Sequence, residues 1–393
     1  MPRDSGFWRG IVAPCVVLFT AAAFAQSRTA KAPQEVAMEN GTHEFVPSRV
    51  VDFEPVETDP SFALPAITND YPHCLSDGSL VLRSTDWDAV RNTPKGKIPK
   101  YNEIVTVVRA KKTQTILSAG ISDLTDVLLV ADTFPTDAGV YFLLEGTKEQ
   151  PGQPGPGKSP SGIPLKDYRT YVARFDLDGT YKGATELGVE CDVTRPGYCE
   201  IRHLAVFPSG DMLVTESDPA TSTLKVLYLK SSGEVVKQID VPAGRRPINW
   251  GEASSKPDIE RSAKAFLSSV FFTAVGSNIV VWRANVNDPV VEVRQGGGVR
   301  EVPLQIPDGW RFADMVAAND RWVVHLRTEN TPPLAPMSEN TDSYYEMRPQ
   351  DGSLSAKIAE KGDVPLSIAC ESGGAYTSYK MNKAGKMVLL KGQ

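Results

Sequence analysis

The segment Ile201–Val241 shows the pattern from which the rest of the chain is built. It holds four short runs of apolar residues. Some runs are continuous, as in strands buried on both faces, and others alternate with polar residues, as in strands buried on one face. Turn-forming residues separate the runs: Pro-Ser-Gly-Asp, an Asp-Pro pair and Ser-Ser-Gly-Glu. We expect strands at 203–207, 212–216, 224–229 and 235–241. A four-stranded antiparallel unit cannot cover both of its faces alone, so it needs copies of itself packed against it.

The chain supplies such copies. An apolar strand, a tight turn and a second apolar strand ending in a charge recur at 71–83, 126–145, 203–216, 269–283, 314–327 and 367–380. Second hairpin patterns follow five of these copies, at 103–117, 171–187, 224–239, 290–304 and 343–358. The sixth copy is followed by a single strand, 386–393, so we assign its missing outer strand to Arg49–Phe53.

These repeats predict an all-β fold, a six-bladed β-propeller of four-stranded antiparallel blades whose ring is closed by an N-terminal strand. Closing a ring in this way protects the edges of the first and last strands. The irregular spacing of the copies leaves a seven-bladed ring or a β-sandwich as alternatives. The expected organisation is a signal peptide at 1–25, a disordered N-terminal tail at 26–48 and one propeller domain at 49–393.

Two stretches carry a family resemblance. Phe-Asp-Leu-Asp-Gly-Thr at 175–180 and Leu-Ala-Val-Phe-Pro-Ser-Gly-Asp at 204–211 resemble blades of the TolB-like and NHL six-bladed propellers. The resemblance covers most of residues 50–393 as a blade pattern, and it implies a fold without an activity. Lactonases of the gluconolactonase type share such a ring and hold a divalent metal with acidic and amide side chains. No Glu and Asn set stands at the equivalent inner-strand positions here.

Residues 1–25 have the features of a secretory signal peptide. Arg3 and Arg9 form a positive n-region, and the apolar run Ile11–Ala25 that follows ends in Ala-Phe-Ala. The alternative is an uncleaved N-terminal anchor, and no later stretch is apolar over a membrane-spanning length. We therefore expect a secreted or periplasmic protein with no membrane span after cleavage. The net charge of −6 is spread along the chain, which argues against nucleic acid as a partner.

Four of the five cysteines lie beyond the leader, an even number that favours disulfides in an exported chain. Four cysteines allow three connectivities. Cys191 and Cys199 bracket a short loop, whereas Cys74 and Cys370 precede turn glycines in the first and last blades, which are neighbours in a closed ring. We expect the pairs Cys191–Cys199 and Cys74–Cys370. With only four histidines and no C-x-x-C pair, a zinc cluster is not expected.

Loop lengths point to one face of the ring. Long connections at 84–102, 146–169, 241–265 and 328–342 join second to third strands or one blade to the next, and such loops share a face. Turns on the opposite face are short, with 132–139 as the one longer exception. Because insertions on a rigid scaffold concentrate where function is carried, we predict binding at this long-loop face. The Pro/Gly-rich stretch 150–164 is either a lid or a tolerated insertion.

Polar residues that begin the innermost strands converge on the channel mouth at the long-loop face, a natural place for a small ligand. The candidate ligand-binding residues are His73, Asp126, Arg202, His203, Arg311 and Asp314. The alternative for each residue is a charge that marks the end of a strand at the solvent. The two histidines are either structural, or they bind a metal ion or act as a base. Three acidic pairs lack the spacing of a calcium loop: Asp86/Asp88, Asp123/Asp126 and Glu216/Asp218.

The sequence therefore predicts a secreted or periplasmic binding or scaffold module that holds a small molecule, a glycan or a partner protein at the long-loop face. The alternative is a metal-dependent lactonase, hydrolase or lyase with its site at the channel mouth. No catalytic residue or metal ligand is assigned, and a divalent metal is the one cofactor left open. A bound metal would separate the two hypotheses, because the enzyme needs a Lewis acid.

Overall fold

The structure is a computed structural model in which β-strands form nearly all of the regular structure. The residues it describes are 48–55, 73–85, 92, 103–109, 112–149, 157–158, 164–165, 168–189, 200–218, 223–241, 270–284, 286–318, 321–331, 338, 341–360, 368–381 and 387–393. Within these ranges the single helical element is a short 3-10 turn, Ser118–Gly120. No helix in this part of the chain has the length and apolar character needed to cross a membrane.

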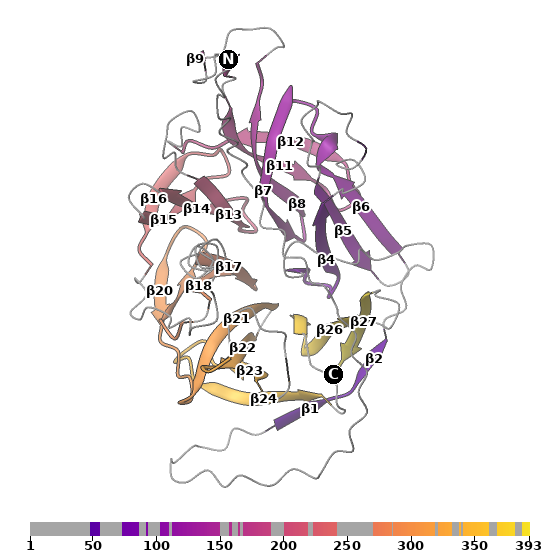
Figure 1. Cartoon of the computed structure of the whole chain (residues 1–393), viewed down its shortest axis with the longest axis vertical. Helices are drawn as coiled ribbons and strands as arrows, with labels where there is room; N and C mark the ends of the chain where they lie inside the picture. The colour runs from indigo at the N-terminus through magenta and orange to yellow at the C-terminus, as the bar shows by residue number, and fades with distance from the viewer. Residues whose placement is uncertain are drawn as a thin grey trace, which may run out of the picture.

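Six four-stranded antiparallel sheets stand in a ring, which confirms the predicted six-bladed propeller (Figure 1). Blade 1 consists of β3 (His73–Cys74), β4 (Leu80–Thr85), β5 (Glu103–Arg109) and β6 (Lys112–Leu117). Blade 2 consists of β7 (Asp126–Thr136), β8 (Gly139–Thr147), β11 (Arg169–Phe175) and β12 (Tyr181–Glu186). Blade 3 consists of β13 (Glu200–Val206), β14 (Met212–Asp218), β15 (Thr223–Leu229) and β16 (Val235–Ile239). The small hairpin β9 (Gly157–Lys158) and β10 (Pro164–Leu165) lies between β8 and β11 in sequence.

The remaining blades continue the ring. Blade 4 consists of β17 (Val270–Val275), β18 (Asn278–Arg283), β19 (Val290–Val293) and β20 (Val299–Val302). Blade 5 consists of β21 (Trp310–Ala318), β22 (Trp322–Thr328), β23 (Asp342–Met347) and β24 (Leu354–Glu360). Blade 6 contains β25 (Ile368–Ser372), β26 (Ala375–Met381) and β27 (Met387–Gly392). The inner strands of these three blades also pair with one another in parallel, at Val275↔Ala318 and Ala317↔Cys370.

An N-terminal strap, residues 48–55, closes the ring. The predicted single strand at Arg49–Phe53 is in fact two strands, since β1 (Ser48–Val51) pairs in parallel with β24 of blade 5. Only β2 (Phe53–Pro55) supplies the fourth strand of blade 6, antiparallel to β27. Gly392 allows this crossing, because a Cβ there would lie 2.4 Å from Val51 Cγ1. The strap therefore spans the seam between blades 5 and 6.

The strap is held by an ionic contact as well as by its strands. Arg49 Nη1 donates to Glu346 Oε1 at 2.9 Å, and Arg49 Nη2 donates to the carbonyl of Gly374 at 3.2 Å. Arg321 donates to the same Glu346 oxygen at 2.8 Å, and the hydroxyl of Tyr376 also donates to it. One carboxylate in blade 5 thus receives donors from the strap, from its own blade and from blade 6.

Glycine turns set the contact between neighbouring blades. The β23–β24 turn includes Gly352 with φ +71°, where a Cβ would lie 1.6 Å from the carbonyl oxygen of Pro303 in the preceding blade. The N–H of Gln305 donates to the carbonyl of Gly352 at 3.0 Å, so the two backbones are in direct contact. One expected turn was wrong: β7 continues through 132–136, and the turn is only Asp137–Ala138.

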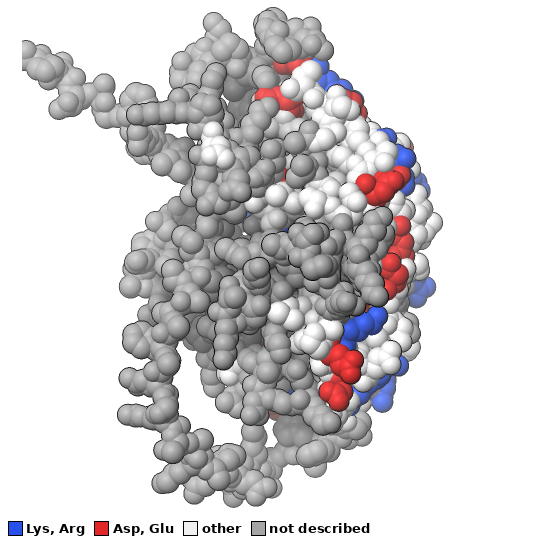
Figure 2. All heavy atoms as spheres, turned by 90° about the vertical axis from the view of Figure 1, so that its right-hand side faces the viewer, with Lys and Arg blue, Asp and Glu red and all other residues white. Residues whose placement is uncertain are grey.

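The apolar core lies between blades rather than at the ring centre. Leu80 and Leu82 of blade 1 pack with Ala369 and Leu389 of blade 6, which shows that the first and last blades meet. Larger clusters join blades 2, 3 and 4, blades 1 and 2, and blades 4 and 5. In the view of Figure 2, acidic and basic side chains of the described surface are intermixed, with no patch of one sign.

Candidate functional site

β-Bulges interrupt four of the six innermost strands near their beginnings, at the end that receives the long connections. The register shifts between Val130 and Asp132 in β7 and between Ile201 and Leu204 in β13. The same happens between Phe312 and Asp314 in β21 and between Ile368 and Cys370 in β25. A bulge leaves a residue out of the ladder and redirects the side chains beside it. Polar side chains are thereby turned toward neighbouring blades at the long-loop end of the ring.

Asp132 joins three blades at this end. Its Oδ2 accepts the N–H of Leu204 at 2.8 Å and lies 3.7 Å from His203 Nδ1, both in blade 3. Its Oδ1 accepts from Arg83 Nη1 of blade 1 at 3.4 Å and from the N–H of Thr133 at 2.8 Å. Burial alone would raise the pKa of Asp132, but His203, Arg83 and the Leu204 N–H together hold it below the ordinary value. Asp132 is therefore a fixed anion.

Arg83 connects this aspartate to a second carboxylate in its own blade. Its Nε donates to Glu103 Oε2 at 3.3 Å, and its Nη2 donates to the carbonyl of Val130 at 3.3 Å. Arg83 and Glu103 are both buried, with side chains 9 % and 8 % exposed. The two carboxylates and the carbonyl compensate the buried charge of Arg83. Because one carboxylate and the carbonyl belong to blade 2, Arg83 also anchors blade 1 to blade 2.

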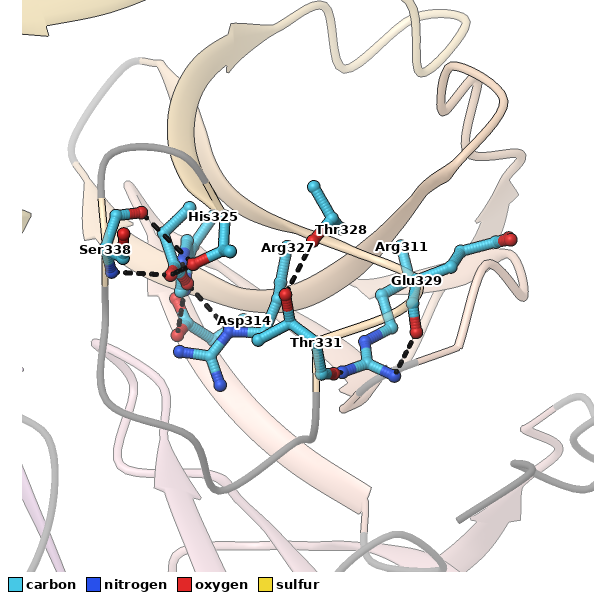
Figure 3. Close-up of polar contacts among 10 residues, drawn as sticks. Arg311, Asp314, His325, Arg327, Thr328, Glu329, Thr331 and Ser338 are labelled. Carbon is cyan, nitrogen blue, oxygen red and sulfur yellow. Dashed lines mark hydrogen bonds and ion pairs between the residues drawn. The ribbon is translucent and has the colours of Figure 1, made fainter. Parts of the chain in front are cut away.

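The blade-5 network is the second polar cluster, formed by Asp314, His325, Arg327 and Asp342. Figure 3 shows Asp314, His325 and Arg327 side by side. His325 is 3 % exposed and lies between two carboxylates. Its Nδ1 is 3.0 Å from Asp314 Oδ2, and its Nε2 is 2.8 Å from Asp342 Oδ1. Burial would lower the pKa of His325, but the two aspartates raise it to about 9. The ring is therefore an imidazolium near neutral pH, with both N–H groups donating.

Asp342 ties this network to the β22–β23 connection of the long-loop face. Its Oδ1 also accepts Arg327 Nε at 2.7 Å. Its Oδ2 accepts the N–H of Ser338 at 2.9 Å and the hydroxyl of Thr341 at 2.7 Å. Burial would raise the pKa of Asp342, but these donors hold it far below the ordinary range. Both carboxylate oxygens of Asp342 are thus fully engaged.

Asp314 has a different position. One of its oxygens is held by His325, yet 15 % of its side chain remains exposed on the innermost strand. Tyr379 of blade 6 lies close enough that the charge of Asp314, after burial, raises the pKa of the phenol. Asp314 is therefore a partly exposed carboxylate whose orientation is fixed by a hydrogen bond from the buried imidazolium of His325.

Two of the sequence-predicted residues, His203 and Asp314, occupy these clusters. Arg311 lies beside the blade-5 network and donates to the backbone carbonyls of Glu329 and Thr331. His73 instead packs edge-on against Phe134 at 5.8 Å, while His203 packs against Phe271 at 5.0 Å. Each histidine thus contacts a phenylalanine of the following blade. The remaining two candidates lie at the starts of their strands: Asp126 accepts the hydroxyl of Tyr168 at 3.0 Å, and Arg202 is exposed.

Among the described residues, no group of three or more His, Cys, Asp or Glu side chains is arranged to hold a metal ion. The donor chemistry explains this in blade 5, because an imidazolium whose two N–H groups both donate to carboxylates offers no lone pair. In the acidic pair Asp123/Asp126, the carboxylate of Asp123 accepts the hydroxyl of Tyr181 and the N–H of Ala184. Glu216 pairs with Lys225 at 2.9 Å. These side chains do not fit a lactonase-type metal site.

Several predictions lie outside the described residues: the signal peptide, the N-terminal tail, Asp86/Asp88, most of each long connection, and Cys191 with Cys199. Cys370 is fully buried, and β25 contacts β3, which ends at Cys74. The side chain of Cys74 is not among those described, so the pair Cys74–Cys370 stays a prediction.

Asp132, His325 and Asp342 are not among the residues predicted from the sequence. A usable signal was present in β22, whose sequence Trp-Val-Val-His-Leu-Arg places His325 and Arg327 on one face of an otherwise apolar strand. Two basic side chains on a buried strand require acidic partners. The first acidic residue of the next described strand, Asp342, is that partner.

No protein-family model matches the chain, and no curated protein matches it in sequence. Solved structures do show a likeness. A streptogramin B lyase has a TM-score of 0.36 at 13 % identity, over 87 % of this chain and 98 % of its own. A Trypanosoma rangeli sialidase bound to the inhibitor DANA has a TM-score of 0.40 at 10 % identity, over 88 % of this chain and 58 % of its own. A Lactobacillus plantarum protein has a TM-score of 0.36 at 12 % identity, over 87 % and 95 % of the two chains.

Scores this low carry no argument about activity. The fold rests on the strand order itself, and what this chain does has to be argued from its own side chains.

Proposed function

We propose that this chain is an exported binding module whose ligand lies at the channel mouth on the long-loop face. Export is inferred from the leader pattern of residues 1–25 and from the even number of later cysteines. The ligand class is a small polar molecule, a glycan or a polar segment of a partner protein.

The observation that carries the proposal is the preorganisation of polar groups on the inner strands. Asp132, His203 and Asp314 stand on or beside bulges in three different blades. Their side chains are 15 %, 27 % and 15 % exposed, so each is mostly covered and still reachable. A small number of fixed polar groups is what sets the orientation of a polar ligand in its binding site. Fixing them in the free protein lowers the entropy that binding would otherwise cost.

The state of His325 favours binding over general-base catalysis. A general base at neutral pH needs an unprotonated nitrogen within reach of the substrate. His325 is buried and protonated near neutrality, with both nitrogens engaged. Its role is to position the carboxylate of Asp314 rather than to accept a proton.

A ligand screen tests the proposal. Wild-type protein purified after export would be screened by thermal shift and calorimetry against sugars, oligosaccharides, amino acids and organic acids. Asp314→Asn and Asp132→Asn remove charges at the channel mouth, and Asp178→Asn is the matched control. Asp178 is exposed in the β11–β12 turn, on the face opposite the long loops, where its side chain caps the N–H of Thr180 at 2.9 Å.

We expect a ligand whose Kd rises about tenfold or more in at least one site variant and stays unchanged in the control, as loss of a charged hydrogen bond implies. A ligand that binds both site variants as well as wild type would refute the proposed location. If no compound in the panel binds, the result counts against a small-molecule site. A pull-down with the same variants then tests whether the ligand is a segment of a partner protein.

A further inference from the structure

Two leucines on the innermost strand of blade 2 are exposed. Leu128 is 49 % and Leu129 is 39 % exposed, near the start of β7 at the long-loop end. The other large apolar side chains exposed in the described part of the chain lie on the strap or on the outermost strands β16 and β20: Val50, Val236 and Val299. The leucines thus expose apolar surface at the channel mouth, where the polar groups of the proposed site also lie.

The register of β7 places Leu129 on the same face of blade 2 as Asp132. Leu129 pairs with Glu145 of β8. Asp132 pairs with Leu143, because Ala131 is the extra residue of a bulge. The two partners are separated by one residue of β8, so Leu129 and Asp132 point to one face, about 7 Å apart along the strand. Leu143 packs in the core cluster shared by blades 2, 3 and 4, so this face looks toward blade 3.

Aromatic side chains continue this face into blades 3 and 4. His203 Nδ1 lies 3.7 Å from Asp132 Oδ2, and the His203 side chain is 27 % exposed. The His203 ring contacts the ring of Phe271, at the start of β17, with centroids 5.0 Å apart. Phe271 is partly buried and stacks on Trp282 at 4.9 Å. Asp132 therefore lies between an exposed leucine of blade 2 and an aromatic pair that leads to blade 4.

Asp132 can accept a further hydrogen bond. Its two short bonds come from the backbone N–H groups of Thr133 and Leu204, both at 2.8 Å. The contact with Arg83 is longer, at 3.4 Å, and 15 % of the Asp132 side chain is exposed. A carboxylate has about four lone-pair positions, so capacity for another donor remains. A fixed anion accepts a hydroxyl or an ammonium group and repels a second carboxylate.

We propose that Leu129, with Leu128 beside it, and Phe271 bind the apolar body of an amphipathic small molecule whose hydroxyl or ammonium group donates to Asp132. This inference rests on the proposed function and deepens it by naming the class of ligand. Mostly apolar surface with a few fixed polar groups is the usual composition of a small-molecule site. A plain sugar would leave the leucines uncovered, and a ligand with an acidic end would meet the charge of Asp132.

Two competing explanations give different results. In the first, the leucines are ordinary exposed side chains, since single apolar residues at a protein surface are normal. A probe would then bind Leu129→Ser as it binds wild type. In the second, another copy of the chain covers the leucines. Self-association of wild-type protein in sedimentation velocity that is lost in Leu129→Ser would overturn the small-molecule proposal.

The test is a titration by ligand-observed saturation-transfer NMR of the purified full-length exported protein at neutral pH. Phenethyl alcohol and phenethylamine carry the same apolar body with a hydroxyl or an ammonium group. Phenylacetate carries an aromatic body with a carboxylate, and ethylamine carries the ammonium group without the body. Leu128→Ser and Leu129→Ser probe the apolar contact. Val299→Ser is the matched control, because Val299 is 50 % exposed on the outermost strand of blade 4.

We expect phenethyl alcohol, phenethylamine or both to bind wild type and Val299→Ser saturably, in the millimolar range that so small a probe allows. The Kd should rise about tenfold in Leu129→Ser, as loss of a buried leucine contact implies. Phenylacetate and ethylamine should bind about tenfold more weakly than the better probe, or less. The tighter of the two main probes identifies the donor as a hydroxyl or an ammonium group. Unchanged binding in both leucine variants, or phenylacetate binding as tightly as the other two, would overturn the proposal.

Failure of this proposal can be told apart from failure of the proposed function. If no probe binds while a polar ligand from the screen depends on Asp132 or Asp314, the apolar contact fails and the proposed function stands. If the probes bind through Leu129 without any preference against phenylacetate, and no ligand from the screen depends on either aspartate, the polar site of the proposed function fails as well.

Discussion

Deprotonating His325 should destabilise the protein, and the size of the effect follows from the blade-5 network. The imidazolium donates to Asp314 and Asp342 at once, and a neutral ring carries only one N–H. One carboxylate would then lose its hydrogen bond from His325 while both negative charges remain. The pKa of His325 is raised to about 9 in the folded chain from an ordinary value of 6.5. That difference corresponds to roughly 3 kcal/mol of folding stability, as an upper estimate.

Because the folded-state pKa is the higher one, this stability is fully present below about pH 6.5. It is lost as the pH rises through about 9. Urea unfolding of wild type, His325→Gln and His203→Gln at pH 6.5 and pH 9.5 measures it. We expect wild type and His203→Gln to lose about 3 kcal/mol more than His325→Gln over this interval. Parallel pH profiles for wild type and His325→Gln would refute the assignment of the proton to His325.

Four further outcomes are expected. Gly352→Ala should lower the free energy of unfolding, measured in urea, by about 3 kcal/mol or more, because a backbone carbonyl lies 1.6 Å from the added Cβ. Gly296→Ala is the control: it has open space at a similar φ and should lose only about 1 kcal/mol. Arg49→Ala should lose about 1–2 kcal/mol and speed amide exchange in β1, since Arg49 ties the strap to Glu346; unchanged exchange there would count against that role. Elemental analysis of protein purified without chelator should find no stoichiometric metal, and one Ca, Zn or Mn per chain would favour the enzyme alternative. Peptide mapping without reductant should find the two disulfides Cys74–Cys370 and Cys191–Cys199. Free thiols or another pairing would contradict this prediction.

Local patterns were enough to predict the blades. In blade 3 the expected strands at 212–216 and 224–229 lie within β14 and β15, because each strand is an apolar run bounded by a turn whose glycine adopts a positive φ. The ring closure was predicted only in outline. Nothing in Arg49–Phe53 shows that two short strands serve two different blades, since that depends on Gly392 at the other end of the chain.

The candidate site was harder to predict for a physical reason. A β-bulge shifts the alternation of the two strand faces by one residue. The runs Leu128–Ala131 and Leu204–Val206 are apolar at every position, so this shift, which redirects Asp132 and His203, leaves no local signal. Asp132 also fell in a stretch read as a turn, because Pro135 and Gly139 are turn residues by composition. Pro135 is instead paired within β7. Arg311 and Asp314 were identified because strand starts at a channel mouth can be placed from topology alone.

Hydrogen exchange with and without a ligand from the screen tests the channel-mouth site most directly. Slower exchange is predicted in peptides covering 126–132, 200–204 and 310–314, the bulged starts of β7, β13 and β21. The turns of the opposite face, at 76–79, 208–211 and 350–353, should exchange as before. Protection confined to those turns, with none at the three strand starts, would contradict the account.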